Sequence, residues 1–365
     1  MIEKDLGYRR IQKTGRGSYI ISLPKSWVED LQLRKGSEVT FQIQNDKTLI
    51  LVPRTVIEGH QEISQGKYLI YAGPEENPQT LSHKIISLYV NNADYIHIYF
   101  KTNQQILKCK RVLKDVIKNK LLGSEIIEET DKEITIQILI NHPDFPIEKA
   151  IRRMTILALL ANKDAILSLK GLDDELLENT FETYNDVNRL SLYAIRQLKY
   201  NLEQNSYKKL GFRTPKEFLG YRILVNDLKS IATNAVNIAK NISTLKNLVE
   251  EQVIVVNELV DEEIYNQILT FNSYATDIFE ESLRAMLKRD YEKADKILMK
   301  LDKSDSYEKD LISLMFTKKL DPNISSILRL ILDSPRKMLE YSRNISEITL
   351  NRTIEELETI QNISD

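Results

Sequence analysis

The sequence predicts a multidomain α+β protein with a strand-rich front segment, a small α/β layer in the middle and an all-helical rear part. Near the front, Val39, Phe41 and Ile43 alternate with polar residues, as expected for a half-buried strand. Residues 65–142 alternate between strand-like and helix-like runs, and from residue 147 onward apolar side chains recur with helical periodicity. At 365 residues the chain is long enough for several domains with separate cores.

Composition and charge favour a globular protein with one basic module. The chain is 42% apolar and 28% charged, which is ordinary for a folded protein. The first 54 residues hold ten Lys/Arg against six Asp/Glu, out of 51 and 53 in the whole chain, so the remainder is net acidic. Such an asymmetry is typical of a polyanion-binding module joined to other domains, although a short segment also reaches it by chance.

Several classes of protein are excluded. The single cysteine, Cys109, cannot form an intramolecular disulfide framework or a multi-cysteine metal site. The first residues lack the apolar core of a signal peptide, and no apolar run approaches the roughly 18 residues of a membrane span, so we expect a soluble, cytoplasmic protein without membrane insertion. No nucleophile elbow, Walker loop or HExxH motif is found, and we do not expect an enzyme.

The front segment, residues 1–54, reads as strands with one short helix. "SYIISL" and "EVTFQIQ" are rich in β-branched and aromatic residues, and "TGRGS" and "QNDKT" supply turn residues between strands. Pro24 stands where a helix accepts proline in its first turn, and Trp27 and Leu31 follow one turn apart. About fifty residues with few apolar positions form a thin core, which makes pairing with a second copy plausible.

Two further parts follow. In residues 65–142 the predicted order is strand, helix, strand, helix and two strands, but the order of the strands within the sheet does not follow from the sequence. The rear part breaks at "GLDDE", "LGFRTP", "STLKN", "KLDKSDS" and "KLDPN", which predicts six long helices. We interpret these as two three-helix bundles, residues 147–245 and 248–352, related as a weak internal repeat.

The segment "YRRIQKTGRGSYIISLPKSWVEDLQLRKGSEVTFQIQNDKTLILVP" resembles the AbrB/SpoVT family of swapped-hairpin DNA-binding domains, which also occur in antitoxins. The resemblance implies an obligate homodimer in which two chains interlace their hairpins into one small β-barrel. It also implies that the barrel lays a positive face on double-stranded DNA.

Six residues of this segment are candidates for DNA contact: Arg9, Arg10, Lys13, Arg16, Ser18 and Lys25. Basic side chains on adjacent strands neutralise backbone phosphates, and a serine hydroxyl donates to phosphate oxygens. The alternative is that the charges only protect a strand edge against aggregation, and that Lys25 only solvates the first helical turn.

The helical part resembles two PhoU repeats, through "DVNRLSLYAIRQL", "LKSIATNAVNIAKNI" and "LRLILDSPRKMLEYSRNISEITLN". The whole chain is similar to archaeal regulators that fuse an AbrB-like domain to PhoU. This resemblance implies a role in restraining phosphate uptake and the associated signalling. The middle α/β layer is not explained by the PhoU repeat.

PhoU repeats typically carry an acidic E/D-x-x-x-D motif that holds metal ions, because carboxylates four residues apart share a helix face. Here the motif positions fall on Tyr184 and Asn188, on Lys229 and Thr233, and on Arg336 and Glu340. Only Glu340 is acidic, so we expect no metal cofactor. Weak metal candidates are the pairs Glu182 with Asp186 and Glu258 with Glu262, together with Glu340, although a solvated helix face is the favoured explanation of the two pairs.

The sequence leaves two main functions open. The first is a phosphate-responsive transcription regulator whose AbrB-like domain binds DNA. The second is a scaffold that dimerises through this domain and docks its helical repeats on a phosphate transporter or signalling protein, without binding DNA. A metal-dependent hydrolase on the acidic helix faces is a remote third.

Overall fold

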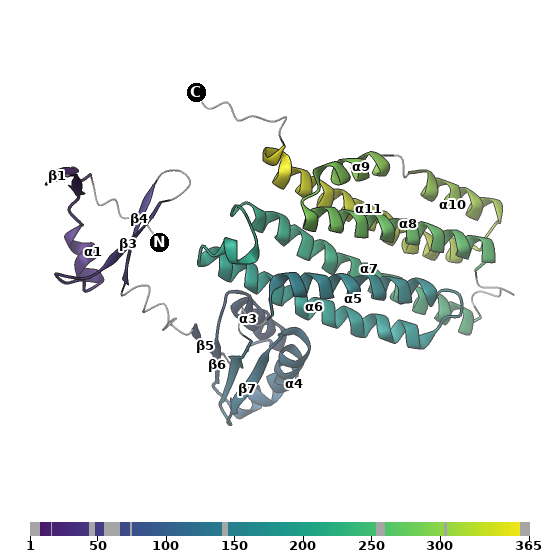
Figure 1. Ribbon diagram of the computed structural model, residues 1–365. Coiled ribbons are helices and arrows are strands. Elements are labelled where there is room, and N and C mark those ends of the chain that lie inside the picture. Colours follow the sequence, from purple (N-terminus) through teal and green to yellow (C-terminus); the bar gives the residue numbers. More distant parts are fainter. Residues whose placement is uncertain are drawn as a thin grey trace. The chain divides into compact units, whose positions relative to one another are not determined.

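The computed structural model describes residues 8–15, 17–43, 48–54, 66–73, 75–140, 145–252, 260–302 and 305–357. The chain forms two compact units, Met1–Gln65 and Gly66–Asp365 (Figure 1). Each unit is described by itself. The predicted site residues Arg16 and Glu258 lie outside the described residues.

The first unit consists of two hairpins and a short helix. Strand β1 (Gln12–Thr14) pairs antiparallel with β2 (Ser18–Ile20), and β3 (Val39–Ile43) pairs antiparallel with β4 (Leu49–Pro53). Helix α1 (Lys25–Asp30) follows Pro24 as predicted. The β1–β2 turn contains Gly15 at φ +57° and Gly17 at φ +125°, and the latter conformation is open essentially to glycine alone.

The described residues of one chain do not form the expected barrel. The two hairpins belong to separate two-stranded sheets, and of the described residues of this unit only Pro53 is buried. An isolated hairpin has no second layer with which to enclose a core. The described residues of this unit, taken by itself, therefore leave its apolar side chains exposed.

The second unit begins with a four-stranded sheet in the order β5-β6-β8-β7. Its elements are β5 (Lys67–Ala72), α3 (Pro78–Val90), β6 (Tyr95–Phe100), α4 (Asn103–Lys120), β7 (Ser124–Glu129) and β8 (Glu133–Ile138). The α3 crossover makes β5 and β6 parallel, whereas β8 is antiparallel to both its neighbours. The predicted order of elements is confirmed, and the structure supplies the strand order that the sequence does not determine.

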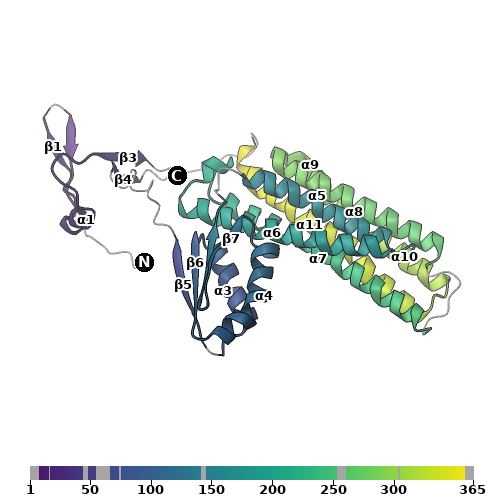
Figure 2. The same ribbon diagram turned by 90° about the horizontal axis from the view of Figure 1, so that it is seen from below.

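One face of this sheet is covered by helices. Ile70, Ile96, Phe100, Ile134 and Ile136 point from alternate strand positions into a core that α3 and α4 close (Figure 2). The sole cysteine, Cys109, is buried in this core, where it packs as a small apolar side chain. The opposite face of the sheet is not covered by any described element of this unit.

The remaining chain is helical. Its elements are α5 (Ile147–Leu167), α6 (Asp174–Glu203), α7 (Glu217–Glu250), α8 (Glu262–Lys288), α9 (Tyr291–Leu301), α10 (Asp305–Thr317) and α11 (Pro322–Thr353), with 3₁₀ turns η1 (Tyr207–Leu210) and η2 (Ile354–Glu356). An aspartate carboxylate accepts from backbone N–H groups at the start of four of these helices: Asp173, Asp261, Asp290 and Asp321.

The prediction of six long helices is wrong in two places. The expected break at residues 243–247 does not occur, because Ser243 and Thr244 donate their hydroxyls to the carbonyls of Ala239 and Lys240 and remain within α7. In the second bundle, the expected first helix, which would run on to the break at "KLDKSDS", is divided into α8 and α9. The additional break falls at Arg289, which adopts a left-handed conformation and ends α8.

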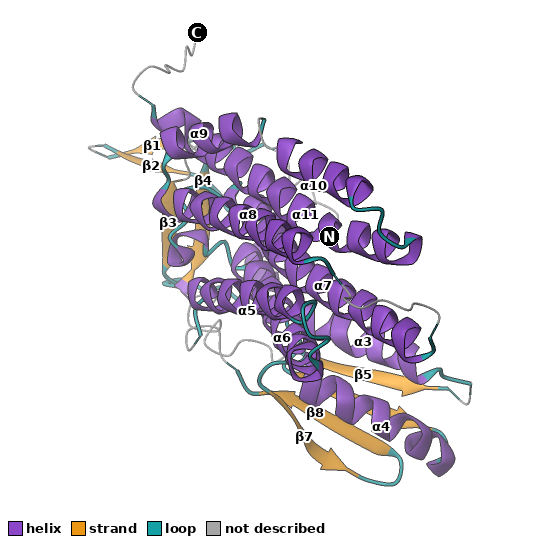
Figure 3. Cartoon of the chain, turned by 90° about the vertical axis from the view of Figure 1, so that its right-hand side faces the viewer, coloured by secondary structure: helices purple, strands orange, loops and turns teal. Residues whose placement is uncertain are grey.

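The two groups of helices share one core. Helices α5, α6 and α7 pack together, α11 packs on α8, α9 and α10, and α7 lies against α11 (Figure 3). At Gly220 a Cβ atom would lie 2.6 Å from a methyl carbon of Ile348, so only glycine permits this approach of α7 to α11. Buried amides link the groups further: Asn162 donates to Asn272 (2.8 Å), and Ser334 donates to Asn162 (3.2 Å).

Arg196 of α6 attaches the helical part to the α/β layer. Its side chain is 2% exposed, and Nη1 donates to the carbonyl oxygens of Tyr89 (2.6 Å) and Ala93 (2.8 Å) at the end of α3. Nη2 lies 3.4 Å from Oδ1 of Asp94, and the guanidinium stands 5.1 Å from the centre of the Tyr89 ring. The C-terminal carbonyls of α3 are thus satisfied by a cation from another domain.

Replacing Arg196 with methionine keeps the volume but leaves two buried carbonyls and Asp94 without their donor. We expect Arg196→Met to lower the free energy of unfolding by about 3 kcal/mol or more. Urea unfolding followed by circular dichroism measures this effect. Lys199→Met, which removes a single exposed contact to Asn91, is the matched control, and equal midpoints for the two variants would contradict the assignment.

Asp227 of α7 provides a pH-dependent contact with α11. It is 7% exposed and accepts from Nδ2 of Asn344 at 3.3 Å. Burial raises the pKa of Asp227 to about 6, from an ordinary 3.8, and the Asn344 hydrogen bond only partly opposes this. The folded state therefore binds the proton more tightly, and its stability falls as the pH rises through this range.

We expect Asp227→Asn to match the wild-type stability near pH 4 and to exceed it by about 3 kcal/mol above pH 6. The amide keeps the shape of the carboxyl group without the cost of a buried charge. Denaturant unfolding of both proteins between pH 4 and 8 provides the test. A stability difference between the two proteins that does not grow over this pH range would contradict the prediction.

Candidate nucleic-acid interface and helical-repeat motifs

The β1–β2 hairpin holds two of the predicted DNA contacts. Lys13 pairs with Tyr19, and Thr14 pairs with Ser18. Because side chains alternate along a strand, Lys13 and Ser18 belong to opposite faces of the ribbon. The hairpin is exposed on both faces, and a two-stranded ribbon of this kind fits the major groove of DNA.

The other predicted basic contacts surround this hairpin. Arg9 and Arg10 precede β1 in extended, exposed chain, where Arg9 donates only to the carbonyl of its neighbour Tyr8. Lys25 opens α1 and lies 3.6 Å from Glu29, with both side chains largely exposed. Trp27 is half-buried, in line with a packing role.

The second pair of acidic-motif positions, Lys229 and Thr233, carries no acid and lies near basic residues. Lys229 is half-buried on α7, and burial lowers its pKa, with nearby Arg222 and Lys120 acting in the same direction. Thr233, one turn further, donates its hydroxyl to the Lys229 carbonyl. Neither position offers the carboxylate oxygens that a hard cation requires.

At the motif positions of α11, the positive charge beside Glu340 comes from the Arg336 guanidinium. Nη1 of Arg336 donates to Oε1 of Glu340 at 2.9 Å, and Nη2 pairs with Asp333, which also pairs with Lys337. Burial opposes ionisation of Asp333, but hydrogen bonds from Lys337 and Arg336 outweigh it and lower the pKa of Asp333. The charge of Glu340 is therefore compensated internally.

The remaining metal candidates are exposed. Glu182 and Asp186 lie on the solvent side of α6, with Asp186 3.8 Å from Arg189. Glu262 lies 3.9 Å from Lys170. Among the described residues, no group of three or more His, Cys, Asp or Glu side chains is arranged to hold a metal ion.

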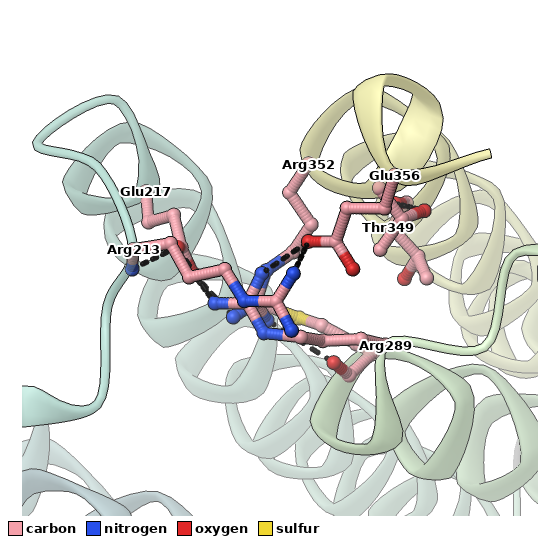
Figure 4. Close-up of polar contacts among 8 residues, drawn as sticks. Arg213, Glu217, Arg289, Thr349, Arg352 and Glu356 are labelled. Atoms are coloured by element: carbon pink, nitrogen blue, oxygen red, sulfur yellow. Dashed lines mark hydrogen bonds and ion pairs between the residues drawn. The ribbon is translucent and has the colours of Figure 1, made fainter. Parts of the chain in front are cut away.

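A buried ion-pair cluster that the sequence did not reveal joins the helices at one end (Figure 4). Glu217, the first residue of α7, accepts from Nη2 of Arg289 at 2.7 and 2.8 Å and from Arg352 of α11. Arg289 and Arg213 also pair with Glu356.

The positive charges in this cluster compensate the cost of burying the Glu217 carboxylate. Burial alone would raise the pKa of Glu217, but hydrogen bonds from Arg289 and the Arg213 backbone, with the charge of Arg352, lower it. The partners lie more than 70 residues from Glu217 along the chain, except Arg213. Spacing in the sequence therefore gave no signal for this cluster.

Comparisons with known families agree with this geometry. Residues 12–58 match the family of MazE, the bacterial antitoxin of antidote–toxin recognition, and residues 151–242 match the PhoU domain. No curated protein and no solved structure matched the chain. Among the described residues, no helix has the length and apolarity to cross a membrane.

The matched families indicate the kind of domain that each matched segment forms. Both are regulatory and not catalytic. In general, MazE/AbrB-type domains dimerise and bind DNA, and PhoU domains take part in regulating phosphate uptake. The chain joins an N-terminal domain of the MazE/AbrB antitoxin type to a C-terminal PhoU domain.

Proposed function

We propose that this protein is a phosphate-responsive regulator that acts as a homodimer, binds double-stranded DNA through its first unit and controls phosphate uptake or homeostasis. The observation that carries the proposal is the first unit itself. It combines exposed basic residues with apolar strand faces that one chain leaves uncovered.

The β3–β4 hairpin supports the dimer. Its register places Val39, Phe41 and Ile43 opposite Pro53, Leu51 and Leu49, so one face of the hairpin is wholly apolar. Phe41 is 59% exposed and Ile43 is 78% exposed. Apolar surface of this extent is costly in water, and a second copy that presents the same face would cover it.

The basic residues support DNA as the ligand. Arg9, Arg10 and Lys13 are exposed, and of these Arg9 makes one hydrogen bond, to a neighbouring carbonyl. A homodimer doubles these charges, so a single binding event would neutralise several phosphates. The PhoU domain, firmly attached to the α/β layer through Arg196, supports phosphate status as the signal.

A second candidate is a scaffold that dimerises in the same way and docks its PhoU domain on a phosphate transporter or a signalling protein. The pairing of Lys25 with Glu29, and the opposite orientation of Lys13 and Ser18, favour it over a single continuous phosphate-binding face. Mapping genome-bound sites at high and low phosphate separates the two candidates, because only the regulator occupies DNA.

Removing the basic residues should weaken DNA binding. We expect the triple variant Arg9→Ala, Arg10→Ala, Lys13→Ala to lose affinity for duplex DNA of any sequence, because these contacts are made to phosphates. The slope of log affinity against log salt should become less steep, by up to about 5 for six lost contacts in the dimer. Fluorescence anisotropy titrations at several salt concentrations measure both quantities.

Arg34→Ala with Lys35→Ala is the matched control, since both residues are exposed in the same unit but were not assigned to DNA. It should bind almost as the wild type does. DNA binding that is absent in the wild type, or unchanged in the triple variant, would exclude this DNA role and leave the scaffold.

The dimer should depend on the apolar hairpin face. We expect Phe41→Asp to shift the protein from dimer toward monomer in light-scattering measurements, because a charge would have to be buried in the interface. Thr40→Asp places the same charge on the opposite face of β3 and should leave the dimer intact. A wild-type monomer at all accessible concentrations would refute the proposal.

A further inference from the structure

The uncovered face of the middle sheet is a defined surface, here named the open face. It is formed by Lys67, Leu69 and Tyr71 of β5, Tyr95, His97 and Tyr99 of β6, Glu133, Thr135 and Gln137 of β8, and Glu125 and Glu128 of β7. Leu69 is 53% and Tyr71 is 71% exposed, so large apolar and aromatic groups meet solvent here.

Side chains of the open face are held in place by one another. Gln137 donates to the Tyr95 hydroxyl (2.8 Å), and His97 shares a hydrogen bond with Thr135 (3.1 Å). The rings of Tyr71 and Tyr99 meet edge to face, with centres 6.1 Å apart. A surface fixed in this way loses little side-chain entropy when it is covered.

The order of residues in one row across the sheet makes that row complementary in charge to itself. One row runs Lys67, Tyr95, Gln137, Glu125 from the β5 edge to the β7 edge. A two-fold axis can run parallel to the strands, in the plane between two facing sheets and midway between β6 and β8. Rotation about this axis places the row of one copy against the same row of the other copy in reverse order. Lys67 of each copy then faces Glu125 of the other, and the ends of the row carry opposite charges.

We propose that the open face binds the open face of a second copy of this chain. The same axis sets His97 opposite Thr135, and Tyr99 opposite Glu133, where the tyrosine hydroxyl donates to the carboxylate. Two sheets packed face to face in this way have their strands aligned, which is a common geometry of sheet packing. The interface is isologous, as expected for a two-fold dimer.

The charge of the open face argues against single-stranded nucleic acid, the other ligand that exposed aromatic residues on a sheet suggest. Such ligands need a basic groove beside the stacking rings. Here the open face carries Lys67 together with three glutamates, Glu125, Glu128 and Glu133. A polyanion would be repelled, whereas a second copy supplies a lysine for each β7 edge.

The contact depends on the proposed dimer of the first unit. Four strands about 4.8 Å apart and about six residues long present roughly 20 by 20 Å, or about 800 Å² for two copies. This is less than the roughly 1,200 Å² of a stable free-standing interface. The proposed dimer of the first unit would hold two second units in one assembly, and such a linkage raises the effective concentration of a second contact to the millimolar range.

Cysteine cross-linking of the full chain tests the proposal. Lys67 and Glu125 of one chain are separated by three strand spacings, about 14 Å, beyond the roughly 7 Å that a disulfide spans. In the double variant Lys67→Cys, Glu125→Cys, a disulfide between these residues can therefore form only between chains. We expect mild oxidation to yield a covalent dimer in high proportion, with native Cys109 buried and inert.

The single variants Lys67→Cys and Glu125→Cys should each remain uncross-linked, because each residue then faces a carboxylate or an amine. Light scattering before oxidation reports the first-unit dimer separately. A dimer without a cross-link would overturn the open-face contact and leave the proposed function intact, whereas a monomer without a cross-link would overturn both. Binding of single-stranded RNA to the wild type, with loss of that binding in Tyr71→Ala, would also overturn the proposed open-face contact.

Discussion

The burial of one guanidinium determines how the second unit is built. Arg196 enters the α/β layer from α6 and satisfies carbonyl groups at the end of α3, and Asp94, its acidic neighbour, accepts in turn from the Gly66 backbone at 3.0 Å. A buried cation is costly without partners, and three acceptors on Nη1 and Nη2 constrain the angle as well as the distance between the layers. The sheet, its two helices and α6 therefore behave as one body.

Polar groups also specify how the two helical groups meet. Glu217 with its arginines lies at one end of α7, and the amides of Asn162 and Asn272 lie within the core. Apolar packing alone is compatible with many registers between helices, whereas these hydrogen bonds and ion pairs form in only one register. At positions where the sequence comparison with PhoU predicts an acidic motif, this chain has Lys229 and the Arg336–Glu340 ion pair.

Local patterns in the sequence predicted local structure well. The alternation of Val39, Phe41 and Ile43 located a strand and Pro24 located the start of a helix, because both signals depend on neighbours in the chain. The described residues of the first unit show two separate hairpins and no closed barrel, because local strand signals do not determine how hairpins assemble with one another. The sequence predicted a break within α7, because Ser243 and Thr244 are typical loop residues. In the structure their hydroxyls donate to carbonyls of the preceding helical turn, and the helix continues. Arg196 and Glu217 gave no signal, since their partners are distant in sequence.

The continuity of α7 has a mechanical consequence. Its 34 residues form a rod about 51 Å long, with glycine only near its beginning and no proline. Such a rod does not flex at an interior hinge, so a displacement at one end is carried to the other as tilt or translation. Under the proposed regulatory function, a displacement at the far end of α7 would therefore move the Glu217 end against α11, where Gly220 lies close to Ile348.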